Sequence, residues 1–139
     1  MRRMGMTCQP DTLSGVWTGE YQHDQKGREG ATFSAWLTIT EDRLTGSTLE
    51  PNTFAETDQE ELDALLRGHV HGEEVVFLKI YQGLKQEPVY CEGTISEDGR
   101  KIVGKWFFSW PDEISGTFEM VRRRVKADAH EAVTQKATS

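Results

Sequence analysis

Two neighbouring segments, VVFLKIYQG and EPVYCEGTIS, carry side chains suited to acid–base chemistry. If they form a hairpin that turns at residues 83–86, a register with Tyr81 opposite Tyr90 also places Lys79 opposite Glu92. On the inside of a folded domain, a buried Lys or Glu has a shifted pKa suited to proton transfer. A buried charge pair would also orient a polar ligand, so this cluster is the first candidate site.

The same two segments allow the opposite orientation. The four polar side chains then lie outside, and the inner face consists of Val76, Leu78, Ile80, Val89, Cys91 and Ile95. Alternation of apolar and polar residues favours this orientation. Phe77 shares a face with Lys79, however, and so both interpretations stay open.

Other reactive side chains give weaker signals. His69 and His71 share a strand face, a spacing that suits metal chelation, but no third ligand accompanies them, and surface histidines are the favoured interpretation. Cys91 lies in an apolar stretch and is expected to be a small buried hydrophobic residue. Residues 51–61 are acidic and are expected to form a solvated loop with one helical turn at residues 58–63. No metal or other cofactor is predicted.

Aromatic residues form a second candidate site. Six of them are predicted to point inward, namely Trp17, Tyr21, Phe33, Trp106, Phe108 and Trp110. The interior of an eight-stranded barrel is just wide enough for its own side chains, so the rings would either fill a core or line a pocket for a small apolar molecule. Both alternatives remain open.

The elements that position these residues are short and β-rich. Strands are expected at residues 14–23, 31–40, 43–50, 62–71, 74–82, 87–96, 101–110 and 114–122. Nearly all of the connections are too short for parallel crossovers, which predicts an antiparallel meander. Closing it removes both exposed edges, so the predicted fold class is all-β, an eight-stranded antiparallel up-and-down barrel.

Composition restricts the partners. The formal net charge of −7 argues against nucleic acid, and no apolar run approaches a membrane span or a signal peptide, so a soluble cytoplasmic protein is expected. Cys8 and Cys91 are expected to be reduced. Trp36, Leu65, Phe107 and Val121 are predicted to face outward, where an apolar patch would mark self-association or another protein interface.

Short motifs resemble those of the calycin superfamily. Gly15-Val16-Trp17 is similar to the Gly-x-Trp of lipocalins, and residues 122–124 resemble the basic residue that covers that Trp. Residues 91–108 look like a hairpin of avidin-type barrels, although the polar residues that follow the first Trp in avidins are here Glu20, Tyr21 and Gln22. The resemblance implies a lipocalin- or streptavidin-like barrel with a ligand cavity at one end, and it names no ligand.

These observations lead to a ranked set of expectations. The chain is expected to have an N-terminal arm at 1–12, a barrel at 13–124 and a flexible tail at 125–139. The leading function is binding of a small hydrophobic or aromatic molecule; the alternatives are a barrel enzyme and a self-associating module. The expected ligand-binding residues are Trp17, Tyr21, Phe33, Phe77, Lys79, Tyr81, Tyr90, Glu92, Trp106 and Phe108.

Overall fold

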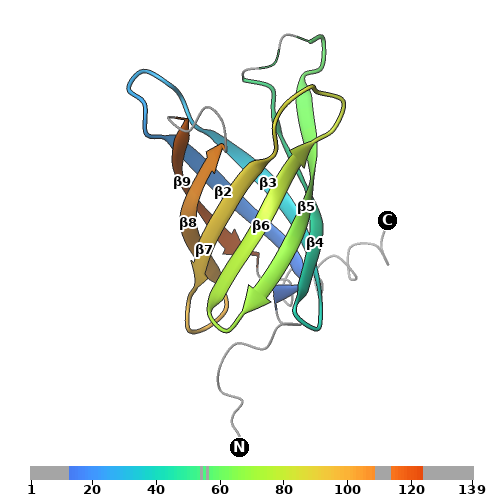
Figure 1. Cartoon of the computed structure of the whole chain (residues 1–139), viewed down its shortest axis with the longest axis vertical. Coiled ribbons are helices and arrows are strands. Elements are labelled where there is room, and N and C mark those ends of the chain that lie inside the picture. Colours follow the sequence, from blue (N-terminus) through green and yellow to red (C-terminus); the bar gives the residue numbers. More distant parts are fainter. Residues whose placement is uncertain (1–12, 54, 56, 109–113, 124–139) are drawn as a thin grey trace, which may run out of the picture.

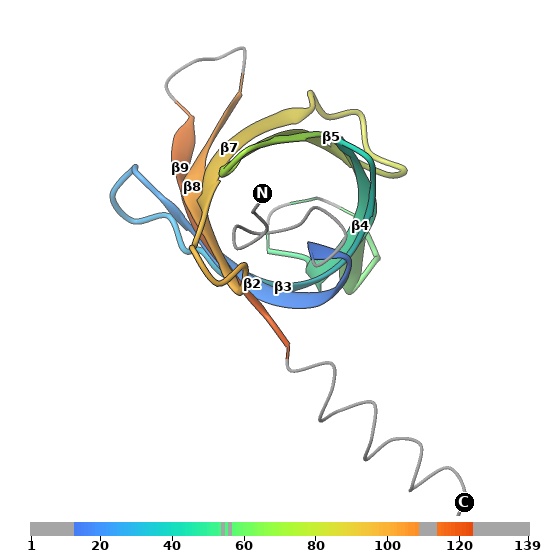
Figure 2. The ribbon, with the colours of Figure 1, turned by 90° about the horizontal axis from the view of Figure 1, so that it is seen from below.

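The computed structural model describes residues 13–53, 55, 57–108 and 114–123 of the chain. Eight antiparallel strands form one closed up-and-down barrel, which confirms the predicted fold class. They are β2 (Gly15–His23), β3 (Ala31–Thr40), β4 (Arg43–Pro51), β5 (Glu61–His71), β6 (Glu74–Tyr81), β7 (Val89–Ile95), β8 (Lys101–Phe108) and β9 (Ser115–Arg122). Each strand pairs with the next in sequence, and β2 pairs with β9 to close the ring seen in Figure 2.

The two ends of the barrel differ. At one end tight connections join the strands, such as the turn at Glu41 and Asp42 and the turn at Gly72 and Glu73. At the other end the connections are longer, because they span residues 24–30, 52–60 and 82–88 (Figure 1). Between the two ends of the barrel, β7 and β8 approach each other closely at Gly104, where a Cβ atom would collide with the carbonyl oxygen of Glu92.

The tight-turn end is filled by apolar side chains. Trp17 is completely buried, and its indole Nε1 donates a hydrogen bond to the carbonyl oxygen of Leu13 over 2.9 Å. Arg122, which lies opposite Trp17 in the β2–β9 pair, donates from Nη2 to the carbonyl oxygen of Ser14 at 2.7 Å. Leu44 and Ile102 are also fully buried, so this end of the barrel is closed.

Side-chain alternation holds on most strands. On β2, β3, β5, β8 and β9 alternate side chains point inward, such as Ala35 and Leu37 of β3 and Phe118 and Met120 of β9. In contrast, the helical turn predicted at residues 58–63 is wrong, because Asp63 belongs to β5. Asn52 instead organises this loop by hydrogen bonds to the backbone of Ala55 and Gln59.

Several predictions fall outside the described residues. These are the N-terminal arm at 1–12, the tail at 125–139, Cys8, Trp110 and the turn at residues 111–112. The Cys91 thiol is free. Among the described residues no helix is both long and apolar enough to cross a membrane.

Candidate functional site

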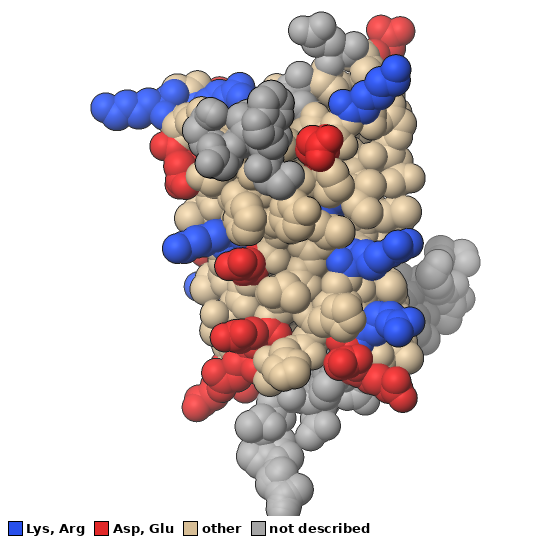
Figure 3. All heavy atoms as spheres, in the orientation of Figure 1, with Lys and Arg blue, Asp and Glu red and all other residues tan. Residues whose placement is uncertain are grey.

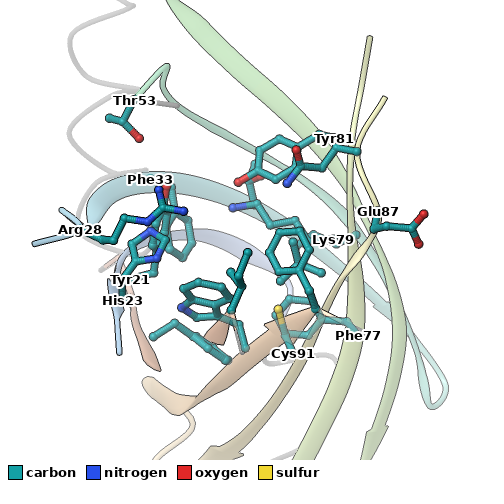
Figure 4. A pocket seen from close by; sticks show the side chains of 18 of the residues that line it. Tyr21, His23, Arg28, Phe33, Thr53, Phe77, Lys79, Tyr81, Glu87 and Cys91 are labelled. Atoms are coloured by element: carbon teal, nitrogen blue, oxygen red, sulfur yellow. The ribbon is translucent and has the colours of Figure 1, made fainter. Parts of the chain in front are cut away.

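A cavity of about 840 Å³ occupies the loop end of the barrel and opens between the connections at residues 24–30 and 82–88. Figure 4 shows side chains from opposite walls converging on it. Seven of the predicted ligand-binding residues line it, namely Tyr21, Phe33, Phe77, Lys79, Tyr81, Trp106 and Phe108. The rings therefore line an open space at this end, and the barrel is filled only at the end where Trp17 lies.

Aromatic contacts fix the walls of the cavity. Tyr21 stacks on Phe33 with ring centroids 6.4 Å apart and meets Trp106 edge-on at 6.0 Å. Phe77 and Phe118 form a further edge-to-face pair at 5.9 Å. Such arrangements are favourable beyond the area they bury, so the rings support one another along the cavity wall.

The polar part of the site is a buried cluster of four residues. Lys79 Nζ donates to Glu50 Oε1 at 2.6 Å, while the Tyr21 and Tyr81 hydroxyls each donate to Glu50 Oε2 at 3.0 Å. The Glu50 side chain is completely buried, and that of Lys79 is 10% exposed. Both carboxylate oxygens thus have charged or hydroxyl donors, which is the condition under which a buried ion pair is tolerated.

Aromatic rings surround the ammonium group of this cluster. Lys79 Nζ lies 4.9 Å from the ring centroid of Tyr81 and 5.2 Å from those of Tyr21 and Phe33. At these distances the ring quadrupoles attract the cation. The Lys79 ammonium group is therefore stabilised by the Glu50 carboxylate and by three aromatic rings.

The predicted partner of Lys79 is wrong. Lys79 pairs in the β6–β7 ladder with Val89, and Glu92 lies opposite Val76, so the register differs from the expected one by three residues. An odd shift changes the face on which a residue lies. Tyr90 and Glu92 are accordingly exposed on the outer wall, where Tyr90 stacks on Phe107.

On β6, Lys79 and Tyr81 lie inside, as in the first of the two predicted orientations, and the opposite orientation is wrong for this strand. Val75, Phe77, Lys79 and Tyr81 face inward, whereas Val76, Leu78 and Ile80 face outward. On β7 that interpretation is confirmed, because Val89, Cys91 and Ile95 are buried. The cluster predicted from four residues of two strands is thus assembled from three strands, β2, β4 and β6.

Sequence reasoning missed three residues of the site. Glu50 was included in a strand but given no role, and Thr48 lies two positions before it on the same inner face. Thr48 and Glu50 are separated from the apolar residue Leu44 by even numbers of positions, so strand alternation places all three on one face. That spacing was the signal that would have predicted an inward direction for both. His23, interpreted as an ordinary surface group, lies at the cavity, where its ring meets that of Trp106 edge-on at 5.0 Å.

Burial sets the protonation states in the cavity. It raises the pKa of both Tyr21 and Tyr81, and the nearby Glu50 carboxylate adds to the effect. Burial also raises the pKa of the Cys91 thiol to about 12, with Lys79 acting in the opposite direction. Burial, followed by the charge of Arg28, lowers the pKa of His23 below its usual 6.5. At neutral pH the phenols and the thiol are therefore protonated and His23 is neutral.

We expect this cluster to make folding sensitive to alkali. In the folded state the pKa of Tyr21 and Tyr81 lies above 10.0, the ordinary value for a Tyr side chain. The stability that these protonated phenols contribute is therefore fully present below pH 10.0 and is lost as the pH rises through the folded-state pKa. Urea unfolding across alkaline pH should show stability falling above that value, with a shallower fall for Tyr81→Phe. Equal slopes for the variant and the natural protein would contradict this assignment.

His69 and His71 are exposed, and within residues 13–53, 55, 57–108 and 114–123 no group of three or more metal-ligating side chains comes together. Lys, Arg, Asp and Glu are interspersed over the face drawn in Figure 3, with uncharged surface between them. The predicted outward residues Trp36, Leu65 and Val121 are exposed, and Phe107 is half-buried beside Tyr90; self-association through them stays a prediction.

Comparison with known proteins gives no family for the chain. No protein-family model matches it, and no curated protein is significantly similar to it.

Proposed function

We propose that this protein is a binding barrel that holds one small, mainly apolar molecule in the cavity at its loop end. The observation that carries the proposal is an open cavity of about 840 Å³ with aromatic rings along its walls and the cluster of Tyr21, Lys79, Tyr81 and Glu50 in its inner part. Ligand sites in proteins are typically concave, about 300–1,000 Å³ in volume and apolar, with a few placed polar groups. We further propose that the barrel belongs to the calycin superfamily, which the Gly15–Trp17 motif and the closed end with Arg122 support.

The state of the polar groups favours binding over catalysis. A general base must have a pKa near the working pH, whereas burial keeps the Tyr21 and Tyr81 phenols protonated well above it. Lys79 is tied to Glu50 at 2.6 Å, and the Tyr90 and Glu92 side chains required by the enzyme hypothesis are on the outer wall. The cluster is therefore better suited to orienting a ligand than to moving protons.

A large side chain that fills the cavity should prevent ligand binding. Cys91 is buried at the cavity wall, whereas its neighbour Tyr90 points to the solvent. Placing a Trp at each position therefore compares the same side chain inside and outside the cavity. We expect Cys91→Trp to abolish binding of an apolar naphthalene derivative, 2-ethylnaphthalene, measured by calorimetric titration. Tyr90→Trp is the matched control and should bind as the natural protein does.

Three results are informative. Binding lost in Cys91→Trp and kept in Tyr90→Trp supports the proposal, provided that both variants keep the β-sheet circular dichroism spectrum. Equal binding by both variants places the ligand outside the cavity. No binding by the natural protein of this probe or of any member of a broad apolar panel would overturn the proposed function.

A further inference from the structure

Among the described residues the charged side chains at the cavity balance, and this balance restricts which ligands can bind. Lys79 is the cation of the inner part, and Glu50 neutralises it at 2.6 Å. The mouth carries Arg28 and Lys85 together with Glu29 and Glu87. Among the described residues the site thus holds three cationic and three anionic side chains.

Unused hydrogen-bonding capacity remains in the inner part. Lys79 has three N–H donors and, within the described part of the chain, donates to Glu50 alone. Thr48 lines the cavity and is 3% exposed, and its Oγ1 is buried with no hydrogen-bond partner among the described residues. Buried polar atoms are nearly always hydrogen-bonded, so an unpartnered hydroxyl at the wall of an open cavity points to a group that enters from outside.

From these observations, and resting on the proposed function, we infer that the cavity selects an uncharged molecule with a ring-sized apolar body and one hydrogen-bond-accepting oxygen, which Lys79 and Thr48 hold. A carboxylate in the same place would add a buried negative charge next to a pair that is already neutral. A ligand without any polar group would leave the Thr48 hydroxyl unsatisfied.

Three naphthalenes of nearly equal shape separate these cases. The probes are 2-acetylnaphthalene, which carries a neutral carbonyl, 2-naphthoate, which carries a carboxylate, and 2-ethylnaphthalene, which carries neither. At neutral pH the natural protein should bind the ketone at least about tenfold more tightly than the carboxylate, because only the carboxylate adds an unpaired buried charge. Equal or tighter binding of 2-naphthoate would overturn the inference.

Variants test whether the buried pair sets this preference. In Glu50→Gln the Lys79 ammonium loses its counter-charge, so 2-naphthoate should now bind more tightly than the ketone. In the double variant Glu50→Gln with Lys79→Met both charges are absent, and the ketone should again be preferred. A ratio of the two affinities that is unchanged in Glu50→Gln would contradict the inference.

Thr48→Val keeps the test usable if Glu50→Gln does not fold. Val has nearly the shape of Thr without its hydroxyl, so affinity for 2-acetylnaphthalene should fall about fivefold, the effect of one neutral hydrogen bond, while 2-ethylnaphthalene should bind at least as tightly as before, because no hydroxyl is left unsatisfied beside it. An unchanged affinity for the ketone would overturn the role of Thr48. If 2-ethylnaphthalene binds but the ketone is not preferred, the inference alone fails. If none of the three probes and no member of the apolar panel binds, the proposed function fails with it.

Discussion

Replacing Glu50 by Gln is expected to lower the free energy of unfolding by about 3–5 kcal/mol, the usual cost of leaving one member of a buried ion pair without the other. The reason is that Lys79 would remain buried while Glu50, its one charged partner among the described residues, at 2.6 Å, would be removed. The two phenol hydroxyls would retain an amide oxygen as acceptor, so the loss lies mainly in the charge pair. Urea unfolding at neutral pH measures it.

Two controls make the result specific. Glu92→Gln is the same substitution on the outer wall, where Glu92 is exposed, and it should change stability by less than about 0.5 kcal/mol. The double variant Glu50→Gln with Lys79→Met should recover most of the loss, because no unpaired charge remains. If Glu92→Gln were the more damaging single change, the observed β6–β7 register would be contradicted.

Replacing Trp17 by Ala is expected to cost about 3–5 kcal/mol, the range for truncating a large buried aromatic side chain. Trp17 is completely buried at the closed end, and its indole also donates a hydrogen bond to Leu13. The variant loses the packing of the buried indole ring, and the carbonyl oxygen of Leu13 loses its hydrogen-bond donor. Thermal unfolding followed by circular dichroism measures the difference.

Trp36→Ala is the matched control, because Trp36 lies on the neighbouring strand and is 44% exposed. We expect a much smaller loss for it than for Trp17→Ala. Comparable losses would mean that the closed end is not packed as described. Trp17 does not line the cavity, so Trp17→Ala protein that remains folded should still bind 2-ethylnaphthalene.

The sequence alone was sufficient for the architecture because turn chemistry and period-two alternation are local signals. Residues 31–40 illustrate this, since Ala35, Leu37 and Ile39 alternate with Trp36 and Thr38, and the strand has the predicted bounds. Short connections then determined which strands are neighbours. The ends of the strands were less well predicted, as β7 begins at Val89 rather than at residue 87.

The site was harder to predict because the outer face of β6 is apolar. Val76, Leu78 and Ile80 face outward, whereas the inner face carries Lys79 and Tyr81 beside Val75 and Phe77, so alternation of apolar and polar residues favoured the wrong face. The register with β7 then depended on the length of the connection at residues 82–88, and an error of three residues paired Lys79 with the wrong glutamate. The true partner lies 29 residues away in sequence on β4, and the contact passes across the inner face of the intervening strand β5, so no pairing of neighbouring strands could predict it.

A crystal structure of the protein soaked with 2-acetylnaphthalene would show where the probe binds. We expect one probe molecule inside the barrel, with its rings against Phe33, Phe77 and Trp106 and its carbonyl oxygen within hydrogen-bond distance of Lys79 Nζ or Thr48 Oγ1. A barrel whose loop end is plugged by its own side chains, or a probe bound only on the outer wall, would contradict it.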